Sequence, residues 1–204
     1  MSSQCGNDCS LDPGQDRQRR TLRVVLLINA IMFVIIVVAA LYSNSSALLS
    51  DSLDNLGDAI TYALSLYAVA RGGASKARVA LFKGILIFLG ASIVAGQVVY
   101  KLLNPAIPIF ELMGGFSLLA LVANSICLLL LWRHRHEDVN MSSVWECSRN
   151  DIATNLSVFI AAGGVWLTNS GWPDLLVASA LVALLYRSAF RVISSARSEL
   201  QAAL

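Results

Sequence analysis

Long apolar segments alternate with short polar ones along almost the whole chain. Segments of the length that crosses a bilayer, about 20 residues, occur at residues 22–42, 46–70, 79–103, 110–132, 142–168 and 172–194. Backbone groups in hydrocarbon must bond within their own segment, and no alternating strand pattern is present, so each segment should be a helix. The pattern predicts an all-α membrane protein, a bundle of six transmembrane helices over residues 21–204. Because the connections are short, consecutive helices should be antiparallel neighbours.

The first 20 residues are polar and lack the apolar middle of a secretory signal. We therefore expect a disordered cytoplasmic tail over residues 1–20 and a first span that is retained. The tail contains two thiols, Cys5 and Cys9, and a charged loop contains two imidazoles, His134 and His136. The sequence leaves the role of both pairs open.

Composition and charge agree with a membrane protein. The chain is 56% hydrophobic and only 14% charged, far from the balance of a soluble domain. All Lys and Arg residues except Lys101 and Arg149 lie before or at the start of the first span, around the second and fourth connections, or toward the chain's end. The positive-inside rule then predicts that both termini are cytoplasmic. We expect the protein to lie in the cell (inner) membrane, with the lipid bilayer around it. We expect no nucleic-acid partner.

The second span carries three carboxylates in the segment SDSLDNLGDAI. Asp51, Asp54 and Asp58 follow the spacing that places side chains on one helix face. An uncompensated charge at the bilayer centre costs about 2.5 to 3.5 kcal/mol. This acidic stripe therefore needs a shared partner.

The fifth span supplies a matching pair. Cys147 and Asp151 are four residues apart, and Asn155 lies one further turn along the same face. If the two spans pack together, Asp54, Asp58, Cys147 and Asp151 can surround one ion tetrahedrally, as zinc prefers. The thiolate argues against magnesium or calcium and favours zinc, cadmium or cobalt. Asp51 and Asn155 would support these ligands or line the pathway.

Such ligands bind metal only when deprotonated, so protons compete with the metal for the same atoms. This competition predicts metal/proton exchange, in which divalent metal and protons are the transported substrates and no resident cofactor is needed. In a plainer interpretation, the acids pair with basic neighbours such as Lys83 and only specify helix order.

Three segments resemble those of one family. NSSALLSDSLDNLGDAITYALSL, SVWECSRNDIATNLSVFIAAGGVW and GWPDLLVASALVALLYRSAFRVI are similar to the second, fifth and sixth helices of the cation diffusion facilitator family. The resemblance covers about residues 20 to 200. It implies metal/proton antiport that exports divalent cations, with ligands at Asp54 and Asp58, and at Cys147 and Asp151. An Asp is also frequent in that family at the position of Asp51.

Two departures from the family pattern affect these expectations. Cys147 stands where the family usually has His, which leaves the preferred metal open. The sequence also ends at Leu204, soon after the last span, whereas most members continue into a soluble dimerising domain. We therefore expect a short member without that domain, in which a homodimer would form through the transmembrane helices.

Two other function classes compete with transport. A membrane subunit or sensor could keep the metal site without the transport cycle, and the sequence discriminates poorly against it. An intramembrane enzyme with paired acids is the other class, either an aspartyl protease or a metal-dependent phosphotransferase. The segment DSLDNLGD has the D-x-x-D spacing of the latter but not the residues that should follow it, and no Gly-x-Gly-Asp segment is present. We therefore expect no enzyme activity.

Overall fold

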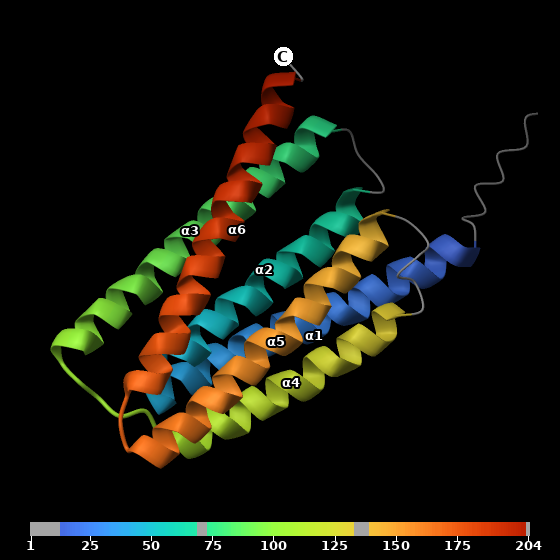
Figure 1. The fold of residues 1–204 in the computed structure, drawn as a ribbon. Coiled ribbons are helices and arrows are strands. Elements are labelled where there is room, and N and C mark those ends of the chain that lie inside the picture. The colour runs from blue at the N-terminus through green and yellow to red at the C-terminus, as the bar shows by residue number, and fades with distance from the viewer. Residues whose placement is uncertain (1–12, 69–72, 133–138, 203–204) are drawn as a thin grey trace, which may run out of the picture.

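The computed structural model describes residues 13–68, 73–132 and 139–202, and Figure 1 shows its arrangement. The helices are α1 (Pro13–Ser43), α2 (Ser46–Ala68), α3 (Gly73–Leu103), α4 (Phe110–Trp132), α5 (Val139–Thr168) and α6 (Trp172–Ala202). These described ranges contain no strand. The prediction of an all-α membrane bundle is confirmed.

Five of these helices contain a stretch long and apolar enough to cross a membrane. The stretches are Arg17–Ser43, Ala80–Leu103, Phe110–Trp132, Ser148–Thr168 and Trp172–Ser198. α2 differs because its three aspartates make it more polar. Its 23 residues still span about 34 Å at 1.5 Å per residue, and it packs against α1, α3, α5 and α6. α2 therefore differs from the other helices in carrying three carboxylates, Asp51, Asp54 and Asp58, while it packs against four neighbours.

The helices form a ring of four and a separate pair. α1 packs against α2 and α4, and α5 packs against α2 and α4, which closes the ring. α3 and α6 pack mainly against each other and lie along one side of it (Figure 1). A Cβ atom on Gly84 of α3 would lie only 2.6 Å from the Ile193 side chain of α6. The small residue thus lets these two helices approach closely.

One prediction about neighbours is wrong. Within the described residues, α3 and α4 follow each other in sequence but share no substantial contact. Their connection contains Pro105 and Pro108 and runs past the end of α1, where the Ile109 amide donates to the Ser43 carbonyl at 2.9 Å. The prolines keep this segment extended. It therefore connects α3, which packs with α6, to α4 of the four-helix ring.

The start of α1 also differs from the prediction. The helix begins at Pro13, so residues 13–20 of the expected disordered tail are helical. Proline is favourable in the first helical turn, where its missing amide hydrogen would have no partner. Residues 1–12, including Cys5 and Cys9, lie outside the described residues, as do His134 and His136.

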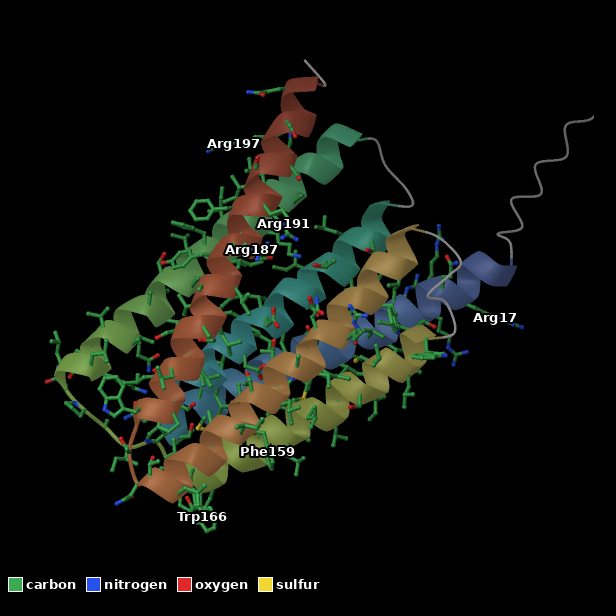
Figure 2. The ribbon with its side chains drawn as sticks, viewed as in Figure 1. Arg17, Phe159, Trp166, Arg187, Arg191 and Arg197 are labelled. Carbon is green, nitrogen blue, oxygen red and sulfur yellow. The ribbon has the colours of Figure 1, made fainter. Side chains whose placement is uncertain are left out.

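The two ends of the bundle have different chemistry. At one end, here called the basic end, α1 begins near the exposed Arg17 and α6 finishes near the exposed Arg197, and the exposed Arg191 and Arg187 lie farther along α6 toward its middle (Figure 2). At the other end, here called the turn end, α1 passes into α2, α3 into α4, and α5 into α6. Asn44 and Asn169 have positive φ angles of 54° and 48° in two of these turns, a conformation that Asn tolerates better than most residues.

Candidate metal site

The acidic stripe of α2 faces the interior of the ring. Asp51 and Asp58 are buried, at 1% and 4% exposure, and Asp54 is half-buried beside them. Asn55 and Tyr62 are buried on the same stripe, as expected for residues three to four positions apart on a helix. The Tyr62 hydroxyl donates to Asp58 Oδ2 at 3.3 Å. Packing thus holds these carboxylates among the helices.

α5 brings its own carboxylate to the same place. Asp151 is buried at 6% exposure, and its side chain lies within hydrogen-bonding reach of Asp58. Among the carboxylates of α2, Asp58 has the strongest electrostatic effect on Asp151, Asp54 comes next and Asp51 is the weakest. Asp54 also reaches Thr154 of α5. The Asp58 and Asp151 side chains therefore lie close together, with Asp54 next in the strength of its effect and Asp51 farther along the stripe.

The thiol is the one proposed ligand whose side chain lies outside the described part of the structure. Cys147 belongs to α5, one turn from Asp151. Among the described side chains, no three of His, Cys, Asp and Glu gather closely enough to hold a metal ion. The described carboxylates alone therefore do not close a site, and a ligand role for Cys147 stays a prediction.

Asparagines accompany the acids on both helices. Asn155 is fully buried, and its Nδ2 donates to the backbone carbonyl of Asp151 at 2.7 Å rather than to the carboxylate. Asn55 makes the same type of bond to the Asp51 carbonyl, at 3.1 Å. Sequence reasoning singled out Asn155 but missed Asn55 and Tyr62. Their spacing from Asp51 and Asp58 is the signal that would have found them.

Lys83 of α3 faces the acidic stripe of α2. Its Nζ contacts the Thr61 hydroxyl of α2, and its charge attracts the half-buried Asp54 carboxylate. Arg149, which lies within the fifth span, has a different environment. Its guanidinium lies 5.4 Å from the centre of the Trp145 ring, a distance suited to a cation–π contact.

A bundle of long apolar helices with buried carboxylates on two of them is a multi-pass membrane protein. The family comparison is consistent with this class. The family model of the cation efflux transmembrane domain matches residues 22–201. The chain belongs to this family, as the resemblance implied, and is a metal cation efflux transporter rather than a member of an enzyme family. No curated protein matches the sequence.

Proposed function

We propose that this transporter exports a zinc-like divalent cation in exchange for protons. Asp54, Asp58, Cys147 and Asp151 would bind the ion between α2 and α5, supported by Asp51 and Asn155. The observation that carries the proposal is the close approach of the buried Asp58 and Asp151 side chains. Two carboxylates this close in a medium of low dielectric are stable only with a proton or a cation between them.

Exchange follows from this requirement. A bound cation neutralises the carboxylates in one state, and protons neutralise the same atoms in the other. Each arrangement excludes the other, so movement of metal in one direction is coupled to movement of protons in the opposite direction. The basic end would face the cytoplasm, because Lys and Arg concentrate on that side of membrane proteins, and the cell (inner) membrane is the proposed location.

The thiol supports the choice of ion. Carboxylate and thiolate together suit zinc, cadmium and cobalt better than magnesium or calcium, which prefer oxygen ligands alone. A competitive transport panel across zinc, cadmium, cobalt, nickel, iron and manganese would rank the ions directly.

Growth of a metal-sensitive host tests the site. Expression of the chain should restore growth on zinc or cadmium, and Asp54→Ala or Asp151→Ala should abolish this protection. Glu111→Ala, which removes an exposed acid in the first turn of α4, is the matched control and should protect fully. Full protection by a correctly inserted Asp54→Ala variant would rule out the proposed site.

Inverted vesicles test the coupling. With an acidic interior, metal accumulation should exceed that seen without a pH gradient. Accumulation that ignores the gradient would rule out proton exchange while leaving the metal site intact.

A further inference from the structure

Lys101 of α3 is a buried cation at the turn end of the bundle. It is 4% exposed, and among the Lys and Arg residues that the structure describes, no other lies near this end. Its Nζ donates to the Asn44 carbonyl at 2.5 Å and lies 3.9 Å from Asp174 Oδ2. Lys101 therefore ties α3 to the turn between α1 and α2 and to the start of α6. Burial of an ammonium group is unfavourable, so packing alone would be served better by an apolar side chain.

The carboxylate of Asp174 has enough donors without Lys101. It accepts the Ser45 hydroxyl at 2.6 Å and the amides of Ser46 and Ala47 at 2.9 and 3.0 Å. The ion pair with Lys101, at 3.9 Å, is longer than a hydrogen bond. The contact of α6 with the start of α2 is thus firm, and the ammonium group of Lys101 is the part of this cluster that can leave.

A cavity of about 310 Å³ lies beside Lys101, which forms part of its wall. The other walls come from the connection between α3 and α4, including Pro105 and Ile107, and from the turn between α5 and α6, including Ser170 and Trp172. The ammonium group of a lysine sits on a flexible four-carbon stem. The cavity therefore offers it a second position at the same end of the bundle, without any change in the α3 helix.

The α3/α6 pair packs on the ring mainly in its turn-end half. One core cluster joins Val94 and Val98 of α3, and Leu175 and Ala178 of α6, to buried residues of the ring. Closer to the basic end, the buried residues of the next cluster all belong to α3 and α6, with Leu53 of α2 packed against them. Figure 1 shows the beginning of α3 and the end of α6 diverging from α2 and α5 toward the basic end. The pair is thus held to the ring at the turn end and separates from it toward the basic end.

The carboxylates of the candidate site lie below this closed end. Asp54 and Asp58 are eight and twelve residues beyond Ser46, the first residue of α2. At 1.5 Å per residue they lie about 12 and 18 Å from the turn end. Ala47 and Leu48, in the first turn of α2, are fully buried. A cation that leaves toward the turn end has to pass this level, so the helices that bury these residues must first move apart.

We propose that Lys101 is a latch that keeps the turn end closed. With its ammonium group on the Asn44 carbonyl, α3 is fastened to the turn between α1 and α2. When the ammonium group moves into the neighbouring cavity, the pair can pivot at the contact of Asp174 with α2, and a path opens for the cation. The inference rests on the proposed function in that an exported cation leaves at the turn end. Closure of that end by Lys101 needs no metal and can be tested without one.

Labelling of a thiol placed inside the closed end tests the latch. Leu48→Cys in the full chain in lipid nanodiscs puts a cysteine at a fully buried position, and its reaction with a polar maleimide reports opening. Rates are measured against the same protein without Leu48→Cys. Lys101→Met should speed the reaction about fivefold, since the net contribution of one hydrogen bond changes a local opening equilibrium by about this factor. Arg197→Met, at an exposed charge near the basic end, is the matched control and should leave the rate unchanged.

The native thiol of Cys127, which is buried in α4, reports loosening of the whole bundle. Its labelling should stay slow in Lys101→Met. An unchanged rate at Leu48→Cys in Lys101→Met would overturn the latch. Equal acceleration at both thiols would also overturn it, because a destabilised bundle would then explain the result.

A second variant keeps the test decisive if Lys101→Met folds poorly. Ile107→Trp fills the cavity and removes the second position of the Lys101 ammonium group, so labelling at Leu48→Cys should slow about threefold. An unchanged rate in this variant would contradict movement of Lys101 into the cavity. Zinc affinity, measured by calorimetry, should be unchanged in both variants. Failure of the parent protein to bind zinc would refute the proposed function alone, because the labelling experiment contains no metal.

Discussion

Asp174 of α6 accepts a hydrogen bond from the Ser45 hydroxyl at 2.6 Å, which joins the start of α6 to the start of α2. The same carboxylate accepts the backbone amides of Ser46 and Ala47 at 2.9 and 3.0 Å. These amides belong to the first turn of α2, where a helix has donors without intrahelical partners. Asp174 therefore caps α2 from a different helix, and it does so while fully buried.

Removal of this cap should destabilise the turn end. Asp174→Ala takes away three hydrogen bonds and also the ion pair with Lys101, whose Nζ lies 3.9 Å from Asp174 Oδ2. Loss of a cap costs about 1 kcal/mol, and a buried charge left without its partner costs about 3 to 5 kcal/mol. We expect a loss of about 4 to 6 kcal/mol in the free energy of unfolding, measured by denaturant titration in micelles.

A second substitution separates the two contributions. Lys101→Met in the Asp174→Ala background removes the unpaired charge, so it should recover part of the loss. The Lys101 Nζ also donates to the Asn44 carbonyl at 2.5 Å, so recovery should be incomplete. If the double variant is as unstable as Asp174→Ala alone, the ion pair makes no measurable contribution.

Close packing of α3 against α6 should not tolerate a methyl group at Gly84. Its Cβ would lie 2.6 Å from the Ile193 side chain and 3.3 Å from the Ile193 backbone nitrogen. Overpacking of this kind costs about 1 to 3 kcal/mol, so Gly84→Ala should lower the stability of the bundle. The matched control is Gly96→Ala on the same helix, where a Cβ meets nothing within 4 Å. Equal stability of the two variants would contradict the observed packing.

The proposed thiolate should affect ions unequally. Cys147→Ser replaces sulphur by a harder oxygen, so it should reduce cadmium transport about tenfold more than cobalt transport, in line with ligand softness. Transport of both ions is measured in the same vesicles. Cys127→Ser, at the buried thiol of α4, is the control and should keep the cadmium to cobalt ratio. Equal losses for the two ions in Cys147→Ser would argue against a thiolate ligand.

Acid should weaken metal binding at the proposed transport site. The ligands hold metal only after releasing their protons, so affinity is greatest at high pH and falls as pH decreases. With one proton displaced per ion, the apparent Kd should rise about tenfold per pH unit within the range where the ligands titrate. Calorimetry of zinc binding between pH 8 and pH 6 measures this slope, and Glu111→Gln should leave it unchanged. A Kd constant across that range would exclude competition between metal and protons.

The sequence predicts the helices well where hydrophobicity defines them. The span predicted at 110–132 coincides with α4, because Pro108 and the charged residues after Trp132 mark both ends. The first helix is longer than predicted, since its polar residues 13–20 show no apolar stretch. The placement of α3 against α6 rather than α4 was not predictable from loop length, because a connection with two prolines can cross the end of a bundle.

For the candidate site, regular spacing was the useful signal. The i, i+4 pairs singled out Asp58 and Asp151, whose side chains lie within hydrogen-bonding reach of each other. Asn29 and Asn124 have no such signal, because a single polar residue in an apolar run has no partner at helical spacing. Only the packing of α1 and α4 into the ring shows that these two amides are buried. Whether Asp58 and Asp151 bind metal stays a prediction.

The polarity of α2 also has a consequence for how the protein is made. A helix with three carboxylates has little tendency to enter hydrocarbon by itself, whereas α1 is the most apolar span of the described chain. Only Asn44 and Ser45 separate the two helices, which pack extensively. α1 and α2 should therefore leave the translocation machinery together as a hairpin, so that the buried face of α2 is covered before it meets lipid.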